Sequence, residues 1–294
     1  MRSRYLGCYG SLVLTPPKRP KPGAPTYSGN IRQLTFDSEV LEDRLDILVY
    51  LPPGYSAQDS WQYPILYLHD GQNVFDENTA VFGVEWGVDE AAERLIHGRQ
   101  MRGIIIVAVA NTPDRIELYT PFPDPKHGGG EGPRYLDFMV NELKPWIDKQ
   151  FSTTDRAEHT AVAGSSLGGL SALYLAWSRP DVFGIAAGIS PSLWWGGRGF
   201  ITAVAGDEKA KMPARIWLDM GTEESSADLN RNGVPDVIDD VRALRAILLS
   251  KGYILGESLF YREVEGGTHD EAAWADRIDD VLKALFPLRE PGLQ

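Results

Sequence analysis

A serine with a glycine two residues away on each side is the best-placed nucleophile in this chain. Gly164, Ser166 and Gly168 form a G-x-S-x-G pattern, which is typical of a sharp strand-to-helix turn that exposes the serine hydroxyl. An apolar run at 158–163 precedes the pattern, and 167–177 carries apolar residues at helical spacing. The pattern therefore predicts a nucleophile for acyl transfer. A glycine-rich turn that only packs a helix on a sheet is the alternative.

A histidine that follows this serine in the chain is the expected general base. The chain has five histidines, and only His269 lies after Ser166, in a glycine-rich segment behind the last predicted strand. Where a serine nucleophile sits on such an elbow, the acid and then the histidine follow it along the chain. His269 is therefore expected to take the proton of the Ser166 hydroxyl and later to protonate the leaving group.

Three carboxylates are candidates for the acid that orients His269. Asp219, Glu223 and Glu224 lie in or just after the predicted strand 215–220. Asp219 is still inside the strand, whereas Glu224 lies beyond the turn glycine, where a side chain can bend toward a neighbouring loop. Glu224 is the favoured acid, with Asp219 and Glu223 as alternatives. Its role would be to stabilise the imidazolium without itself being protonated.

Two backbone N–H groups are the expected donors to the oxyanion. Leu167, the residue after the nucleophile, supplies one of them. The second comes from the loop after the third strand, where Gly71 allows a tight turn and Gln72 presents its N–H. A plain strand-to-helix turn is the alternative for this loop. His69 precedes the serine in the chain, so it is not expected to be catalytic.

Alternating strands and helices must position these residues. Strands are predicted at 31–36, 46–51, 64–69, 103–110, 158–163, 184–190, 215–220 and 258–265, and helices at 87–97, 133–151, 167–177, 235–251 and 271–286. The first two strands alternate like an antiparallel pair, and the later alternation of strands with helices favours a parallel sheet covered on both faces. The sequence therefore predicts the α/β class and an α/β-hydrolase fold, with about eight mostly parallel strands.

The composition fits an enzyme-sized globular protein. The chain has 294 residues, of which 43% are hydrophobic and 24% charged, enough for one large α/β domain or two smaller ones. Its net charge of −12 argues against nucleic acid or anionic membrane surfaces as partners. No apolar run approaches the roughly 18 residues of a membrane span. A lone cysteine, Cys8, rules out an internal disulfide without settling the compartment.

The N-terminal segment differs in composition from the rest of the chain. Arg2 and Arg4 precede a short apolar stretch that glycines interrupt, which resembles a poor export signal and leaves localisation open between cytoplasmic and exported. Residues 15–29 are rich in proline and basic residues. We therefore expect an arm or linker at 1–29 and a catalytic domain at 30–294.

Four segments together resemble the esterase D and feruloyl esterase-like family of α/β-hydrolases. They are H-D-G-Q-N at 69–73, G-S-S-L-G-G at 164–169, S-P-S-L-W at 190–194 and the G-T-x-E turn at 221–224. The resemblance covers about 30–286, and the combination is more specific than the serine turn alone. This family includes feruloyl, acetyl-xylan and enterochelin esterases and mycolyltransferases. The resemblance implies Ser166 as nucleophile, Glu224 as acid and His269 as base.

A segment after the acid matches the template of a calcium-binding loop, D-x-[DN]-x-[DN]-G with a carboxylate at the twelfth position. The expected ligands are Asp228, Asn230, Asn232, the Val234 carbonyl, Asp236 and Asp239. Gly233 permits the sharp turn at position six, whereas aspartate in place of glutamate at position twelve departs from an EF-hand. We therefore expect a structural Ca²⁺ at 228–239 and no organic cofactor. An Asn-Gly turn in which Asp236 caps the next helix is the alternative.

These features together predict a serine esterase that forms an acyl-enzyme intermediate. The expected substrates are carbohydrate-linked or small aryl esters, because Trp86, Trp194 and Trp195 lie near the loops of the predicted site. The same tryptophans would serve equally to pack beneath those loops, and 112–133 is expected to form a rim. Acyl transfer to an acceptor other than water and a non-catalytic, calcium-dependent carbohydrate-binding protein are the alternatives. The oligomeric state is left open.

Overall fold

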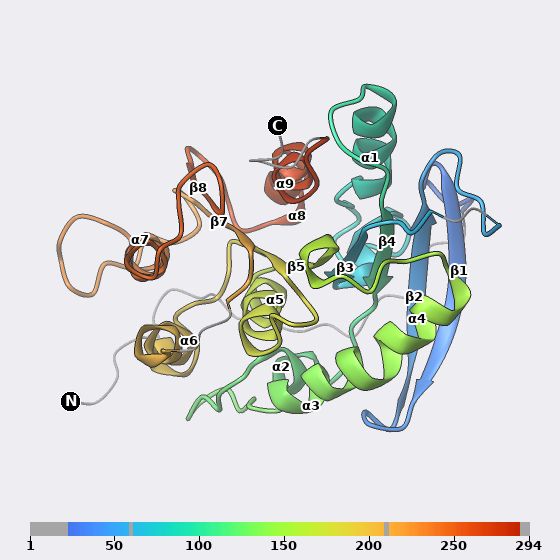
Figure 1. Ribbon diagram of the computed structural model, residues 1–294. Helices are drawn as coiled ribbons and strands as arrows, with labels where there is room; N and C mark the ends of the chain where they lie inside the picture. The colour runs from blue at the N-terminus through green and yellow to red at the C-terminus, as the bar shows by residue number, and fades with distance from the viewer. Residues whose placement is uncertain (1–22, 59–60, 209–211, 289–294) are drawn as a thin grey trace.

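An eight-stranded sheet forms the centre of the molecule (Figure 1). The computed structural model describes residues 23–58, 61–208 and 212–288. The strands are β1 (Asn30–Ser38), β2 (Asp43–Leu51), β3 (Ile65–His69), β4 (Ile105–Val109), β5 (Thr160–Ser165), β6 (Ile185–Ile189), β7 (Arg215–Gly221) and β8 (Leu259–Val264). They lie in the order β1-β2-β4-β3-β5-β6-β7-β8, and only the β1–β2 and β2–β4 pairs are antiparallel. The predicted α/β-hydrolase class and its mostly parallel sheet are confirmed.

Helices cover both faces of the sheet (Figure 1). One face carries α1 (Val88–His97), α8 (Glu271–Ala275) and α9 (Ile278–Leu285). The other carries α2 (Arg115–Tyr119), α3 (Gly132–Asp137), the π-helical turn η2 (Phe138–Leu143), α4 (Lys144–Gln150), α5 (Leu167–Ser178), α6 (Trp195–Gly206) and α7 (Asp236–Ser250). The layers therefore follow the prediction, although several helices differ from it in detail.

The predicted helix 133–151 is observed as α3, η2 and α4 in succession. Pro145 stands near the start of α4, and proline lacks the N–H that would bond to the carbonyl four residues earlier. The π-helical turn η2, whose hydrogen bonds span five residues instead of four, lies directly before this proline-containing turn. The predicted closing helix 271–286 is divided into α8 and α9, which separates Arg277 from both helices. Neither α2 nor α6 was predicted. α2 lies within the segment 112–133 that was expected to form a rim, and the first turn of α6 contains Gly196 and Gly197 at positive φ.

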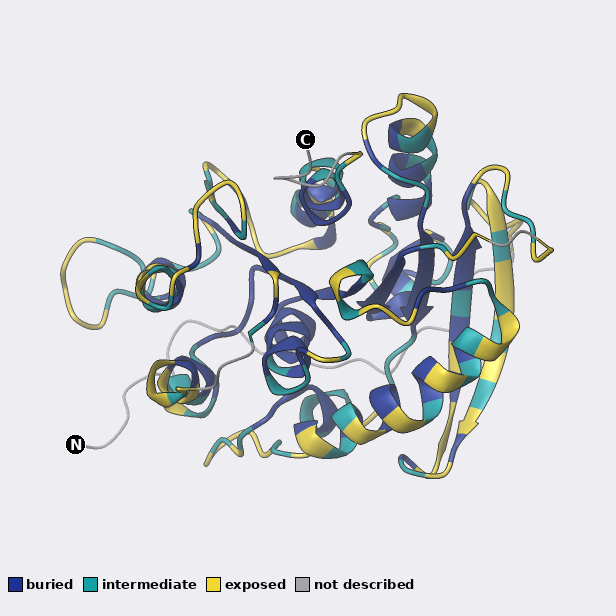
Figure 2. Cartoon of the chain, viewed as in Figure 1, coloured by how far each residue is buried: buried dark blue, intermediate teal, exposed yellow. Residues whose placement is uncertain are grey.

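The central strands are buried on both sides, whereas the antiparallel edge is exposed (Figure 2). Every residue of β3, β4 and β5 is buried, which matches their continuous apolar sequences. In β4, Ile105 and Val107 join the core on one side of the sheet, while Ile106 and Ala108 join the core on the other. This two-sided core fixes the register of the strands that lead into the site.

The described part of the N-terminal arm, 23–29, packs on the catalytic region. The Thr26 hydroxyl donates to Asp76 at 3.1 Å, and the Ser28 N–H donates to Asp89 at 2.6 Å. The rest of the expected arm, 1–22, and Cys8 lie outside the described residues. Among the residues that the structure describes, no helix is both long and apolar enough to cross a membrane.

Candidate active site

The nucleophile turn has the backbone conformation that its sequence predicts. Ser166 joins β5 to α5 with φ 56° and ψ −124°, a conformation that costs a non-glycine residue about 1–3 kcal/mol. A Cβ on Gly164 would lie 2.6 Å from the backbone of Gly168, and a Cβ on Gly168 would lie 3.1 Å from the Asp70 carboxylate. The two glycines therefore let the strand and helix approach closely enough to hold Ser166 in this turn.

Ser166, His269 and Glu224 lie in one hydrogen-bonded chain. Nε2 of His269 lies 2.9 Å from Oγ of Ser166, and Nδ1 lies 2.8 Å from Oε2 of Glu224. His269 follows β8 and Glu224 follows β7, and parallel strands bring their carboxyl ends to the same edge of the sheet. The His269 side chain is 33% exposed and the Glu224 side chain 2%. The structure thus brings together the three residues that the sequence favoured, with the base within reach of the hydroxyl proton.

The two alternative acids lie elsewhere. Asp219 is fully buried and accepts hydrogen bonds from Trp217 Nε1 at 2.6 Å and from the Ser190 N–H at 3.0 Å. Burial raises the pKa of Asp219, although the Arg277 charge opposes the shift. Glu223 is exposed, and its backbone N–H donates to the Gly267 carbonyl at 2.9 Å, in the turn that precedes His269. Of the three candidates, Glu224 alone is hydrogen-bonded to His269 in the described structure.

A second serine lies beside the proposed nucleophile. Oγ of Ser192 is 3.3 Å from Oγ of Ser166, and the Ser192 N–H donates to the Ser166 carbonyl at 3.0 Å. The sequence reasoning did not single out Ser192, although it lies in the S-P-S-L-W segment on which the family resemblance partly rested. The signal that could have identified Ser192 is its position just after β6, the strand next to the one that leads to Ser166.

The loop after β3 presents its N–H groups at the start of a short helix. Asp70 has a left-handed φ of 56°, and Gly71–Asn73 form the 3-10 turn η1. The carbonyl of Gln72 accepts the Thr79 hydroxyl at 2.6 Å, and its side-chain oxygen accepts the Asn111 N–H at 3.2 Å. Gln72 in η1 and Leu167 in α5 both lie in first helical turns, where N–H groups have no acceptor within the helix. Their role as oxyanion donors stays a prediction.

Buried polar groups hold this loop in place. Arg115 donates to both oxygens of Asp70, at 2.6 and 2.7 Å, and Asn111 donates to the same carboxylate. Burial opposes ionisation of Asp70, but the Arg115 charge and these hydrogen bonds lower its pKa below the ordinary value. Burial also lowers the pKa of His69 to about 4, and its Nδ1 lies 3.1 Å from the Tyr135 hydroxyl. His69 is therefore a neutral, enclosed side chain that supports the loop.

Substitution of Gly71 by alanine is expected to weaken both stability and activity. A Cβ at this position would lie 2.6 Å from a backbone carbon of Ala108 and 2.7 Å from one of Val109, so the loop must move away from β4. We expect a loss of about 1–3 kcal/mol in the free energy of unfolding. If the Gln72 N–H is the expected oxyanion donor, kcat for the expected ester hydrolysis should also fall about 100-fold, because the loop that carries this N–H moves.

Thermal unfolding and initial-rate measurements check this expectation. Gly206→Ala is the matched control, because a Cβ there would meet nothing within 4 Å. Stability and kcat in Gly71→Ala equal to those of Gly206→Ala would contradict the assigned close packing.

The three tryptophans differ in their surroundings. Trp86 is 2% and Trp195 4% exposed, so both pack beneath the loops, as the alternative interpretation held. Trp194 is half-buried; its ring centroid lies 5.5 Å from that of Trp195 and 6.2 Å from that of the exposed His127. The predicted rim, 112–133, carries His127. Trp194 and His127 are therefore the aromatic side chains of this group that remain accessible to a ligand.

The expected calcium loop closes through hydrogen bonds between its own polar groups. The side-chain amides of Asn230 and Asn232 donate to Oδ2 of Asp239 at 2.8 and 2.9 Å. The carboxylate of Asp228 accepts the backbone N–H groups of Asn232 and Gly233 at 3.0 and 2.8 Å. The carboxylate oxygens of Asp228 and Asp239, which would have to bind Ca²⁺, thus accept hydrogen bonds from within the loop.

The other two expected ligands lie at the start of α7. The carboxylate of Asp236 accepts the Leu229 N–H at 3.2 Å instead of capping the helix, and the Val234 N–H donates to Oδ1 of Asn232. Within the described ranges, the one group of three metal-ligating side chains whose oxygens lie within 4.8 Å of one another is Glu85, Asp89 and Glu90. The loop carboxylates are therefore not gathered around one point, and calcium binding stays a prediction.

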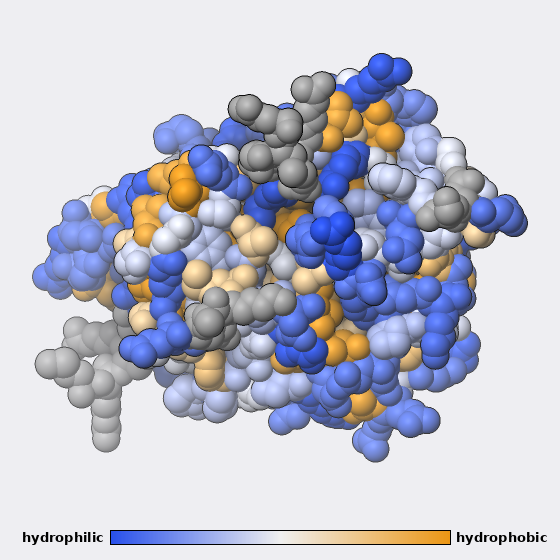
Figure 3. All heavy atoms as spheres, viewed as in Figure 1, coloured by the Kyte–Doolittle hydropathy of each residue, from blue (hydrophilic) through white to orange (hydrophobic). Residues whose placement is uncertain are grey.

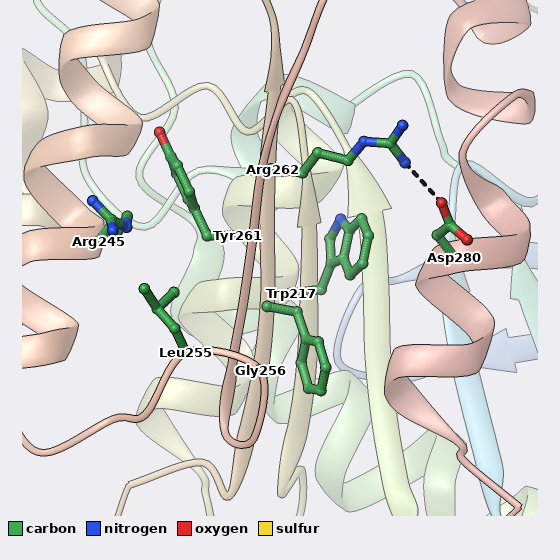
Figure 4. A pocket seen from close by; sticks show the side chains of 8 residues that line it. Trp217, Arg245, Leu255, Gly256, Tyr261, Arg262 and Asp280 are labelled. Carbon is green, nitrogen blue, oxygen red and sulfur yellow. Dashed lines mark hydrogen bonds and ion pairs between the residues drawn. The ribbon is translucent and has the colours of Figure 1, made fainter.

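A groove beside the edge strand β8 contains none of the proposed site residues (Figure 4). It has a volume of about 510 Å³ and is lined by Trp217, Arg245, Leu255, Gly256, Phe260, Tyr261, Arg262 and Asp280. An ion pair of 2.7 Å between Arg262 and Asp280 closes one side. Figure 3 shows hydrophobic and hydrophilic side chains next to one another on the part of the surface where β8 lies. The groove is therefore no extension of the site around Ser166.

Comparison with known proteins finds esterases among the proteins to which this chain is similar. The chain matches the family described as "Putative esterase" over residues 38–285. It is 29% identical over 269 residues to the iron(III) enterobactin esterase of Escherichia coli O6:H1, covering 88% of this chain and 57% of that protein. It is 26% identical over 264 residues to an endo-1,4-beta-xylanase/feruloyl esterase of Xylanibacter ruminicola, covering 88% of this chain and 31% of that protein.

A solved structure shows the same fold. The enterobactin esterase FES of Shigella flexneri superposes with a TM-score of 0.67 at 24% identity, over 89% of this chain and 60% of that one. The chain thus spans about a third to three fifths of the length of these relatives.

Proposed function

The chain belongs to the esterase family of α/β-hydrolases, and from this we propose that it is a serine esterase that hydrolyses carboxylic esters. The observation that carries the proposal is the hydrogen-bonded chain from Ser166 through His269 to Glu224. A serine hydroxyl, a base within 3 Å of it and an acid that orients the base are the parts that acyl transfer through a serine requires.

Hydrolysis would proceed in two acyl-transfer steps. His269 Nε2 accepts the Ser166 proton while Oγ attacks the ester carbonyl carbon, and the same proton then passes to the departing alcohol. Water then attacks the acyl carbon with His269 as base, the bond between this carbon and Oγ breaks, and the imidazolium returns the proton to Ser166 as the carboxylic acid leaves. Glu224 stabilises the imidazolium in both steps. The N–H groups of Leu167 and Gln72 would stabilise the oxyanion, each by about 2.7–4 kcal/mol.

We propose small aryl or carbohydrate-linked esters as the substrate class. The half-buried Trp194 and the exposed His127 offer aromatic surface next to the rim, and aromatic side chains bind aryl groups and sugar faces well. The two curated relatives described above are named as esterases of enterobactin and of feruloyl groups. Both names favour hydrolysis over acyl transfer to another acceptor and over calcium-dependent carbohydrate binding without catalysis.

A panel of esters tests the proposal. Initial rates would be compared for the p-nitrophenyl esters of acetate, butyrate and ferulate, which share one leaving group, with and without a serine-directed phosphonate. We expect turnover of at least one ester, complete inhibition by the phosphonate, and a higher kcat/KM for the feruloyl ester than for the acetyl ester. A protein that hydrolyses none of them, or that the phosphonate leaves active, would contradict the proposed function.

We propose, as a separate prediction, that Ca²⁺ binds the loop 228–239 and stabilises the fold without taking part in catalysis. Binding to the folded state alone would stabilise it by about 2.7 kcal/mol at a hundredfold excess over Kd. Chelator should therefore lower the melting temperature, and Ca²⁺ should restore it better than Mg²⁺, which requires tight octahedral geometry. Calorimetric titration of metal-stripped protein is the direct measurement.

Two variants make the calcium prediction specific. Asp228→Ala should abolish binding, whereas Asp37→Ala, which alters a side chain that is 80% exposed, should bind as the unchanged protein does. An absence of binding at millimolar Ca²⁺, or equal binding in both variants, would show that the loop is a solvated turn.

A further inference from the structure

Arg277 is a buried arginine that lies behind the proposed acid. It is 2% exposed and lies in the break between α8 and α9. Its Nε donates to the Ala273 carbonyl at 2.9 Å, and its Nη1 donates to Oδ1 of Asp219 at 2.7 Å. Nη2 lies 3.7 Å from Oε1 of Glu224 and has no hydrogen-bond partner among the described residues. One buried cation therefore faces two carboxylates, of which only Glu224 contacts His269.

The two oxygens of Glu224 have different partners. Oε2 faces Nδ1 of His269, whereas Oε1 accepts the Gly221 N–H at 2.6 Å and the Ser190 hydroxyl. Arg277 stands on the Oε1 side as well, and its Nη1 lies 3.4 Å from the same Ser190 hydroxyl. The donors on Oε1 fix the carboxylate so that Oε2 points to the imidazole.

The charges in this cluster nearly cancel. With both carboxylates ionised, Asp219, Glu224 and Arg277 carry one net negative charge, and a protonated His269 would bring the total to zero. Asp219 is fully buried, so its charge acts on its neighbours with little screening by water. Loss of Arg277 would leave two uncompensated buried carboxylates, whereas loss of the Asp219 charge would leave Arg277 facing Glu224 alone.

We propose that Arg277, paired with Asp219, is a positioning residue that sets the basicity of His269 through Glu224. This proposal rests on the proposed serine esterase, because it assigns a role in that same site. A purely structural role, in which Arg277 only ties α8 to β7, would affect stability in the same direction for every variant. An electrostatic role requires the two partners to have effects of opposite sign on His269.

Other charges also face His269 and stay constant in the test. Asp270 and Glu271, at the start of α8, both interact electrostatically with His269. Glu271 in turn lies near Asp70 and Arg115 of the oxyanion loop. Because none of these residues is altered, a difference between variants reports on Arg277 and Asp219.

The experiment is a histidine ¹⁵N NMR titration of His269 combined with the pH profile of kcat/KM. Arg277→Met removes a positive charge and should raise the pKa of His269, while Asp219→Asn removes a negative charge and should lower it. We expect shifts on the order of half a pH unit in each direction. The double variant Asp219→Asn/Arg277→Met should return close to the original value, and the acid limb of kcat/KM should follow the NMR result.

Arg215→Met is the control for the loss of a buried arginine. Arg215 is 8% exposed and donates to the Leu285 carbonyl at 2.8 Å, so its removal should leave the pKa of His269 unchanged. If Arg277→Met does not fold, Asp219→Asn and the double variant still test the proposal. The pKa of His269 should fall in Asp219→Asn and return close to its original value in the double variant.

Shifts of the same sign in both single variants, or none in either, would overturn the proposal. The two readouts also separate it from the proposed function. Opposite shifts in a protein that hydrolyses no ester would contradict the esterase but support the coupling to Arg277. Ester hydrolysis with an unshifted His269 would contradict only the coupling.

Discussion

Replacement of Ser166 by alanine is expected to lower kcat for ester hydrolysis by about 10⁴–10⁶-fold while the protein stays folded. The variant lacks the oxygen that must bond to the acyl group. The fold should persist, because alanine fits the turn held by Gly164 and Gly168. Removal of the hydroxyl also breaks only two side-chain contacts among the described residues, those with His269 and Ser192. Initial rates with p-nitrophenyl acetate and thermal unfolding measure the two effects.

His269→Ala should lose a similar factor, and the double variant should be little worse than either single one. Residues that act as a unit give such non-additive effects, because removal of one already disables the other. Ser171→Ala is the matched control. Ser171 lies in α5, the helix that follows Ser166, is 1% exposed, and has a hydroxyl without a hydrogen-bond partner among the described residues. Independent, multiplying losses in the double variant would contradict a shared mechanism.

Replacement of Glu224 by glutamine is expected to lower kcat by about 10⁴-fold. The amide has nearly the same shape, but it carries no charge and therefore cannot stabilise the imidazolium. KM should change little, because Glu224 is enclosed behind His269. Steady-state kinetics at a pH where kcat no longer changes with pH measure the effect.

Asp219→Asn is the comparison that decides between the two acids. It should lower kcat much less than Glu224→Gln, because in the described structure Asp219 is linked to His269 indirectly, through Arg277 or Ser190 and then Glu224. If Asp219→Asn proves the more damaging substitution and Glu224→Gln is close to the unchanged protein, the acid has been assigned to the wrong residue.

Local sequence was sufficient for the sheet and for the candidate triad. The apolar runs of β3 to β5 predict buried strands because each run is long enough to fill one strand. Ser166, Glu224 and His269 could be proposed because each stands at the end of a strand and because their chain order is fixed in such sheets. The structure places them within hydrogen-bond distance, and their catalytic roles remain to be tested.

Features that depend on distant parts of the chain were not predictable in the same way. Asp219 and Arg277 are 58 residues apart in sequence, and nothing near either residue indicates the pairing. The start of α6 could not be predicted from helical spacing, because Gly196, Gly197 and Arg198 there have positive φ and do not follow the geometry of a regular helix. Ser192 is near Ser166 only because β6 lies beside β5.

The site of covalent modification tests the central claim most directly. The protein would be treated with diethyl p-nitrophenyl phosphate and analysed by intact-mass and peptide mass spectrometry. We expect one diethyl phosphoryl group per chain, on Ser166, formed much more slowly in His269→Ala and absent in Ser166→Ala. Modification of the neighbouring Ser192 or Ser165 in place of Ser166, or equal labelling of Ser166→Ala, would contradict the account.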